Sequence, residues 1–277
     1  MNCTSLTELN MGSNNLEGSI SELNFSRLNK LSKLDLRKNH LTCIILISPY
    51  SCKYLKAIRL GINDLEGEIQ PGILLLKFLS FLSLGYNRMT NITKAMKILM
   101  HCKNLVVLSL SSSFVGEEFP ADLGTAGVEG FQNLRMLALG KSVNLVGKSS
   151  KALLYRFGQL NRISGGFPKE LCKLPILGSE RSTAQVDDIY LELSIYGFQG
   201  STLVQYKLTF FPPAIYIANN TINGNIPTEI GHLKLLHTLS LSNNNYSGNI
   251  PEQLSNLENL ENLDPSMNHL SGKSHCH

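Results

Sequence analysis

The stretch LHTLSLSNNNYSGNIP, residues 236–251, decides the fold, because its apolar residues and one asparagine fall at fixed intervals. Leu236, Leu239 and Leu241 stand at offsets 0, 3 and 5, followed by Asn244 and Tyr246 at offsets 8 and 10. The Leu-x-Leu element is typical of a short strand with one buried face, since successive side chains of a strand point to opposite sides. The asparagine can satisfy backbone groups that a turn leaves unpaired, and glycine and proline complete that turn.

The same register recurs along most of the chain. Further copies start at Leu6, Leu31, Leu55, Leu79, Leu105 and Leu134. The first four starts are 25, 24 and 24 residues apart, within the range of leucine-rich repeats. One such repeat cannot bury its apolar edge alone, so neighbouring repeats stack and their strands form a parallel sheet on the concave side. The sequence therefore predicts an α/β leucine-rich-repeat solenoid.

The register is interrupted twice. It fails around 144–163, where a repeat that resumes at Ile163 and Gly165 is predicted to lack its middle. A non-repeat segment rich in Tyr, Asp, Ser and Gly follows before clean copies return. We expect repeats over 1–174, an island segment over 175–212, and further, truncated repeats over 213–277. Pro265 occupies a strand position of the last copy and predicts a frayed or edge strand there, because proline removes a ladder donor.

Composition and motifs exclude several functions. The 277 residues carry a formal net charge of +4, without the clustered Lys and Arg that nucleic-acid binding needs. We expect no signal peptide and no membrane-spanning segment in this chain, because no apolar run approaches about 20 residues. No zinc-protease, serine-hydrolase or kinase motif is present, so we predict no enzyme, no cofactor and no metal. The terminal His275, Cys276 and His277 suggest a metal site only weakly, since adjacent side chains point in different directions.

Three cysteines share a position in the repeat. Cys3, Cys52 and Cys102 each lie three residues before a repeat's first leucine, where other repeats place compact hydrophobic residues. We predict that these three are buried. The remaining cysteines show no shared spacing, so pairing among them stays open: Cys43, Cys172 and Cys276.

Five sequons would accept glycans in a secreted protein: Asn2, Asn24, Asn91, Asn219 and Asn245. Asparagine-rich repeats also generate sequons by chance, so they support an extracellular setting only weakly.

Ligand-binding candidates stand at outward positions of the predicted strands: Lys33, Arg37, Lys56, Arg59, Tyr86 and Arg135. Lys33, Lys56 and Arg135 belong to different repeats but share one face, which would present positive charge to an acidic or sulfated peptide. An ordinary solvated surface is the alternative for each of them. In the island, Asp188, Tyr190 and Glu192 alternate with apolar residues and predict a strand edge that could pair with an extended peptide.

Specific motifs indicate which group of leucine-rich-repeat proteins this chain resembles. Residues 223–234 and 247–254 look like the plant extracellular repeat with its Gly-x-Ile-Pro signature. The motifs FPKELC at 167–172, DDIYLEL at 187–193 and PPAIY at 212–216 resemble the ectodomain of receptors for tyrosine-sulfated peptides. That group includes the phytosulfokine receptors and related receptor-like proteins without a kinase.

This resemblance implies an island that folds onto the concave face and helps to bind a peptide. It also implies a co-receptor kinase of the somatic-embryogenesis type and a place at the plasma membrane, on the extracellular side. We therefore expect the ligand-binding ectodomain fragment of a plant receptor or receptor-like protein. The alternative is a truncated, non-signalling interaction scaffold or a degenerate gene product.

Overall fold

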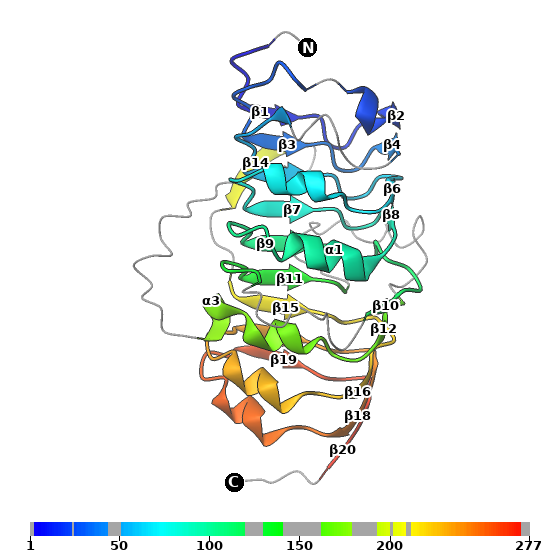
Figure 1. The fold of residues 1–277 in the computed structure, drawn as a ribbon, viewed down its shortest axis with the longest axis vertical. Coiled ribbons are helices and arrows are strands. Elements are labelled where there is room, and N and C mark those ends of the chain that lie inside the picture. The colour runs from blue at the N-terminus through cyan, green and yellow to red at the C-terminus, as the bar shows by residue number, and fades with distance from the viewer. Residues whose placement is uncertain are drawn as a thin grey trace.

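The computed structural model describes residues 3–23, 25–43, 51–119, 130–140, 162–178, 193–199, 202–208 and 212–272, and it contains a nine-stranded sheet. The strands lie side by side along the long axis of the molecule (Figure 1), and each pairs in parallel with the next. In order they are β1 (Glu8–Asn10), β3 (Lys33–Asp35), β5 (Ala57–Arg59), β7 (Phe81–Ser83), β9 (Val107–Ser109), β11 (Met136–Ala138), β15 (Ala214–Tyr216), β17 (Thr238–Ser240) and β19 (Asn262–Asp264). The predicted stacking of repeats through a parallel sheet is confirmed.

Each repeat leaves this sheet through a turn and forms a second short strand. These strands pair in parallel as well: β2 (Glu17–Ser19) with β4 (His40–Thr42), β6 (Glu66–Gly67) with β8 (Arg88–Met89), β10 (Glu118–Phe119) with β12 (Ser164–Gly165), and β16 (Asn223–Asn225) with β18 (Asn245–Asn249) and β20 (His269–Ser271).

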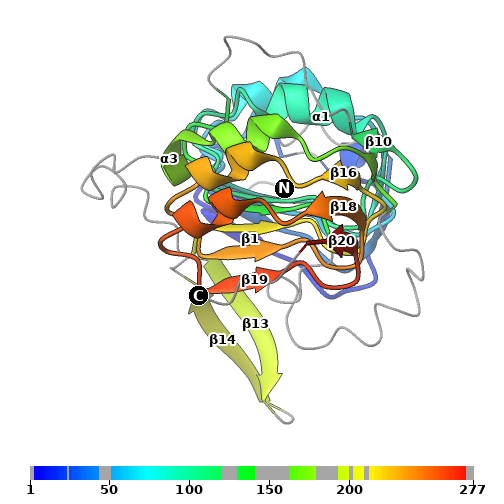
Figure 2. The same ribbon diagram turned by 90° about the horizontal axis from the view of Figure 1, so that it is seen from below.

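Helical turns return the chain along the side opposite the nine-stranded sheet (Figure 2). They are η1 (Ile20–Glu22), η3 (Pro71–Leu75), α1 (Ile92–Leu99), η4 (Lys169–Lys173), α3 (Pro175–Gly178), η6 (Thr228–His232) and η7 (Glu252–Asn256). Helix α1 is the longest of them. Its first turn is capped by the side chain of Asn91 and by the Glu117 carboxylate, which accepts from the Asn91 and Ile92 amides at 2.6 Å. No helix in the described residues has the length and apolarity needed to cross a membrane.

The core is one continuous column of the repeat leucines. Leu34, Ile58, Leu82, Leu108 and Leu239, each the middle residue of a strand, are at most 1% exposed. Each points away from the concave face, as the alternation of a strand requires.

Asparagines at offset 8 hold neighbouring repeats together. Asn63 is fully buried, and its Nδ2 donates to the carbonyl of Leu60 in its own repeat at 2.9 Å and to that of Leu36 in the preceding repeat at 3.1 Å. Its Oδ1 accepts from the Leu41 amide at 3.1 Å. Asn87 and Asn244 repeat this set of bonds. Where Ser113 replaces asparagine, its hydroxyl still donates to the Leu84 carbonyl at 2.7 Å.

The repeat that starts at Leu134 is divided in two rather than lacking its middle. Its strand β11 pairs directly with β15, and its second half is supplied by Ile163 and β12, because the Ile163 amide donates to Asn220 Oδ1 at 3.2 Å. This is the bond that Leu41 makes with Asn63. Gly165 permits the close pairing of β12 with β10, since any Cβ there would clash with the Phe119 carbonyl. The sequence pattern misassigned this repeat because residues 141–161, outside the described residues, separate its halves.

The predicted island contains an antiparallel hairpin and part of the solenoid. Strands β13 (Leu193–Gln199) and β14 (Thr202–Leu208) pair with each other and project from the sheet side, away from the helices (Figure 2). Helix α3, at the start of the predicted island, packs with the repeats: Leu177 is fully buried, and its carbonyl accepts from the Leu235 amide at 3.0 Å.

The cysteine prediction holds for two of its three residues. Cys52 and Cys102 are buried, whereas Cys3 is exposed. Cys52 Sγ lies 3.4 Å from the Phe25 carbonyl of the preceding repeat, and in the described residues no repeat stacks over Cys3. Burial raises the pKa of the Cys102 thiol to about 11 and that of Cys172 to about 12. All described cysteines are free thiols, including Cys43 and Cys172. Cys276 lies outside the described residues.

Pro265 follows β19 directly and lies outside it, and β19 pairs with β17 over all three of its residues. Leu263 at its centre is 42% exposed, unlike the corresponding residues of the inner strands.

Replacing Asn63 by alanine is expected to lower the free energy of unfolding by about 2–4 kcal/mol, because it leaves two buried carbonyls and one buried amide without their partner. The matched control is Asn14→Ala, since Asn14 is exposed and bonds only to carbonyls of its own repeat; we expect it to cost about 1 kcal/mol or less. Urea denaturation followed by circular dichroism measures both values. Equal losses for the two variants would contradict the inter-repeat role.

Candidate ligand-binding face

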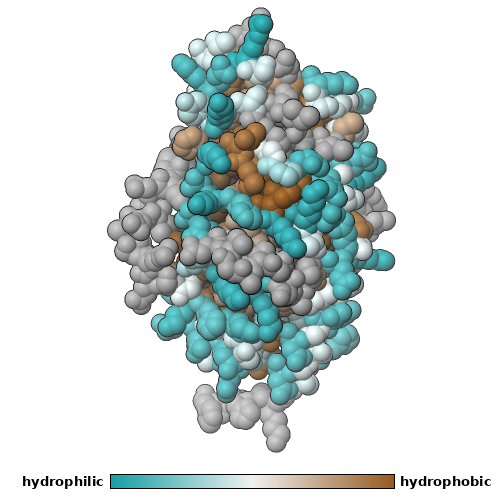
Figure 3. Space-filling view, viewed as in Figure 1, coloured by the Kyte–Doolittle hydropathy of each residue, from teal (hydrophilic) through white to brown (hydrophobic). Residues whose placement is uncertain are grey.

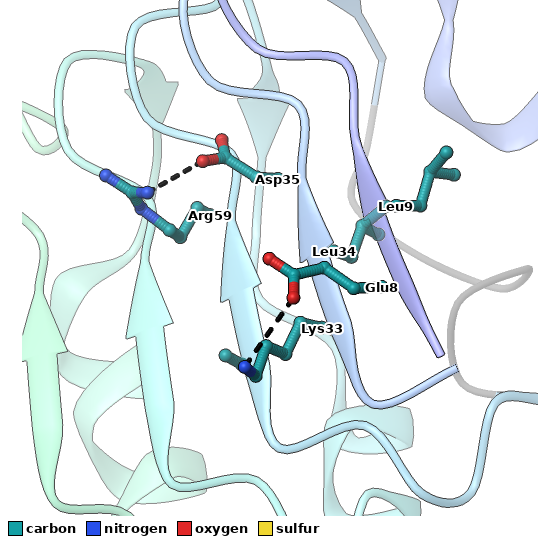
Figure 4. A pocket seen from close by; sticks show the side chains of 7 residues that line it. Glu8, Leu9, Lys33, Leu34, Asp35 and Arg59 are labelled. Atoms are coloured by element: carbon teal, nitrogen blue, oxygen red, sulfur yellow. Dashed lines mark hydrogen bonds and ion pairs between the residues drawn. The ribbon is translucent and has the colours of Figure 1, made fainter. Parts of the chain in front are cut away.

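Strands β3 and β5 bring several of the predicted residues together on the concave face. Lys33 lies on β3 and Arg59 on β5, while Arg37 follows β3 and Lys56 precedes β5. Residues of β1, β3 and β5 line a pocket (Figure 4): Glu8, Leu9, Lys33, Leu34, Asp35, Ala57 and Arg59.

Two ion pairs of different character cross this pocket. Lys33 Nζ lies 3.6 Å from Glu8 Oε2, and both side chains are a quarter or more exposed. Arg59 Nη1 donates to Asp35 Oδ2 at 2.7 Å, and both of these side chains are almost completely buried. The first pair is weak and screened by solvent, whereas the second is an integral part of the packed face.

Asp35 organises the cations around it. Besides Arg59, it receives the Arg37 backbone amide on Oδ1 at 3.1 Å and lies 3.5 Å from Arg37 Nε. Burial lowers the pKa of the Arg59 guanidinium to about 10, Asp35 opposes this effect, and the nearby charge of Arg37 adds to it. Arg59 therefore remains protonated at neutral pH, held between an attracting carboxylate and a repelling cation.

This face carries an excess of positive charge. Lys33, Arg37, Lys56 and Arg59 supply four cations against the carboxylates of Glu8 and Asp35, which leaves two. Lys56 is exposed, so part of this charge is available to solvent. Such a face attracts an anionic group and disfavours a cationic one.

The other candidates lie elsewhere. Tyr86 follows β7 with a φ of 59° and is half-buried; burial raises its pKa, and a hydrogen bond with Ser112 opposes that shift. Arg135 precedes β11, three strands beyond β5 and so about 14 Å away at the usual spacing. Asp188, Tyr190 and Glu192 lie outside the described residues.

The middle of the concave face is apolar, a feature that the sequence analysis did not predict. Ala57, Phe81, Val107, Met136 and Ala214 occupy the same outward position on five consecutive strands. With Val106 they form a cluster in which every residue is at most 6% exposed, and Tyr216 packs against it. The sequence contains the pattern that predicts this stripe, since the first residue of every strand from β5 to β15 in the sheet is apolar.

The described sequons differ in accessibility. Asn91 and Asn245 are exposed and Asn219 is half-buried, while Asn2 and Asn24 lie outside the described residues. Asn91 Nδ2, the atom that a glycan would occupy, donates to Glu68 Oε1 at 2.9 Å. Within the described ranges, no group of three or more His, Cys, Asp or Glu residues is arranged to hold a metal ion, and residues 275–277 lie outside them.

Comparison with known proteins agrees with this architecture. A family model described as Leucine Rich Repeat matches residues 235–257. Receptor-like protein 3 of Arabidopsis thaliana is 40% identical over 254 residues, covering 80% of this chain and 34% of that protein. Phytosulfokine receptor 2 of Arabidopsis thaliana is 35% identical over 176 residues, covering 54% of this chain and 17% of that protein. The chain thus spans about a third or less of the length of these relatives.

Solved structures show the same fold. The plant peptide hormone receptor RGFR1 in complex with RGF2 superposes with a TM-score of 0.66 at 24% identity, over 97% of this chain and 33% of that one. The Arabidopsis receptor kinase HAESA, in complex with the peptide hormone IDA and the co-receptor SERK1, gives a TM-score of 0.65 at 25% identity, over 98% and 35%. The chain is therefore a leucine-rich-repeat solenoid similar to plant receptor ectodomains and receptor-like proteins.

The two ion pairs of the pocket are expected to differ in their contribution to stability. Asp35→Asn should lower the free energy of unfolding by about 2–4 kcal/mol, because it leaves the buried Arg59 charge without its counterion. Glu8→Gln, which removes the exposed partner of Lys33, should change it by less than about 1 kcal/mol. Chemical denaturation of both variants measures the difference. A loss no larger for Asp35→Asn than for Glu8→Gln would show that the Asp35–Arg59 pair is not integral to the face.

Proposed function

We propose that this chain is part of the extracellular ligand-binding region of a plant receptor-like protein, and that its concave face binds an anionic peptide at strands β3 and β5. The observation that carries the proposal is the excess of two positive charges around the pocket, beside the apolar stripe of the same face. We assign the ligand contacts to Lys56, which is exposed, and to Arg37, whose Nε lies farther from Asp35 (3.5 Å) than Arg59 Nη1 does (2.7 Å).

The ligand that fits this face has an extended backbone and a compact anion. A sulfated tyrosine offers both an anion for cationic side chains and an aromatic ring, and charge-assisted hydrogen bonds to such groups are the stronger kind. Similarity to Phytosulfokine receptor 2 supports a ligand of this class, and the HAESA complex supports a peptide joined by a co-receptor kinase. We place the protein at the plasma membrane, on the extracellular side, on the same grounds.

The second candidate is a non-signalling interaction scaffold. It is favoured by the divided repeat, because strand β11 and the second half of that repeat at Ile163 are separated by residues 141–161. Such an interruption weakens a solenoid, because the stability of each repeat depends on its neighbours. Thermal melting followed by circular dichroism separates the two: a sharp cooperative transition supports the receptor fragment, and a broad, gradual one supports the scaffold.

The purified, glycosylated chain is expected to bind a tyrosine-sulfated peptide about tenfold or more tightly than its unsulfated counterpart, because one added charge-assisted contact contributes about 1.5–3 kcal/mol. Isothermal titration calorimetry measures both affinities. The double variant Arg37→Gln/Lys56→Gln should lose this preference, while Lys97→Gln, on the exposed side of α1, should keep it. Equal affinity for the two peptides would refute the role assigned to charge.

A further inference from the structure

A row of lysines and aromatic residues runs along the edge where the chain enters successive strands. The two-residue turns before the first leucines of four repeats contain Lys30, Lys53 with Tyr54, Lys77 with Phe78, and Lys103. We call these six residues the lysine–aromatic edge. Because β3, β5, β7 and β9 pair in parallel and in register, corresponding turn residues such as Lys53, Lys77 and Lys103 recur about 5 Å apart. Lys30 stands one position later in its turn, level with Tyr54 and Phe78.

The two aromatic residues do not serve the fold as their counterparts do. In other repeats the same position holds an asparagine that binds back to the preceding repeat: Asn104, Asn133 and Asn259 donate to the carbonyls of Lys77, Lys103 and Lys234 at 2.7–2.9 Å. Tyr54 and Phe78 replace this asparagine: phenylalanine has no donor, and the Tyr54 hydroxyl makes no such bond in the described part of the chain. Instead they stack on each other, with centroids 6.0 Å apart and planes 19° apart.

Both rings face solvent. Tyr54 is 59% and Phe78 49% exposed, and Leu75 at the end of η3 is 61% exposed. Figure 3 shows hydrophobic residues gathered over the region of η3, with hydrophilic residues around them. An exposed apolar patch rimmed by polar residues is typical of a binding surface.

The edge is locally positive. Its four lysines are exposed. No Asp or Glu occurs in residues 25–34, 51–63 or 75–116, which supply these turns and the strands that follow them. Within the described residues, none of the four lysines forms an ion pair.

We propose that the lysine–aromatic edge binds a linear acidic polysaccharide, a chain of uronate sugars. Such a polymer presents one carboxylate per ring at regular intervals, matching a row of lysines that repeats with the strands. The apolar faces of its rings can pack on Tyr54 and Phe78, since aromatic side chains offer large flat surfaces at low entropic cost. An open edge rather than an enclosed pocket suits an extended polymer.

Other partners fit this edge less well. Lysine is depleted from protein–protein interfaces, so a row of four disfavours a protein partner. Single-stranded nucleic acid would use the same stacking and charge, but four lysines on one edge fall short of a basic groove that tracks a phosphate backbone. This edge adjoins the pocket at β3 and β5, since Lys56 stands two residues after Tyr54. The variants used for its test leave Arg37 and Lys56 unchanged, so its outcome is distinguishable from that of peptide binding.

The test uses the full chain and oligogalacturonate, with the methyl-esterified oligomer as the uncharged probe. We expect the acidic oligomer to bind, its affinity to fall as salt concentration rises, and the esterified oligomer to bind about tenfold more weakly. Lys53→Gln/Lys77→Gln should weaken binding of the acidic oligomer about fivefold to tenfold. Tyr54→Ser/Phe78→Ser should weaken binding of both oligomers, because it removes the stacking surface.

The matched control is Lys234→Gln, which changes the same turn position in a repeat whose following turn carries Glu258 and whose strand edge carries His237 and Glu261. It should leave the affinity unchanged. All substituted side chains are exposed, so circular dichroism melting should show wild-type stability in each variant. The proposal is overturned if both oligomers bind equally, if Lys234→Gln matches Lys53→Gln/Lys77→Gln, or if polyglutamate or single-stranded DNA binds as tightly as oligogalacturonate.

Discussion

The hydrogen bonds of the buried asparagines are the constraint on which the rest of the structure depends. Each of these side chains joins the turn of its own repeat to the backbone of the preceding one, as Asn63 does with Leu60, Leu36 and Leu41. They fix the spacing between repeats and keep the turn's backbone groups satisfied where water is excluded. The strand leucines can then form one continuous column.

That fixed spacing gives the concave face its chemistry. Asp35 and Arg59 meet on adjacent strands only because β3 and β5 are held in register, and a shift of one strand by one residue would turn its member of the pair into the core. The same register aligns Ala57, Phe81, Val107, Met136 and Ala214 into an apolar stripe. One repeating geometry thus produces a cationic pocket and a buried apolar cluster side by side.

The lysine–aromatic edge arises from the same repeats, with different residues at the turn position. Where asparagine occupies the turn, it bonds to the preceding repeat, as Asn104 does. Where Tyr54 and Phe78 occupy it, the solenoid still stacks and the rings are displayed outward. The backbone interactions of the repeat therefore tolerate this exchange, which leaves the turn position open for recognition.

The sequence by itself determined the solenoid, because the spacing of leucines and asparagines is a local pattern that dictates each strand and turn in the same way. Tertiary structure alone decided which cations are engaged, because Asp35 and Arg59 are 24 residues apart in sequence and adjacent only through stacking. It likewise decided that Ile163 completes the repeat begun at Leu134, because its partner Asn220 lies 57 residues away and no local pattern spans that distance.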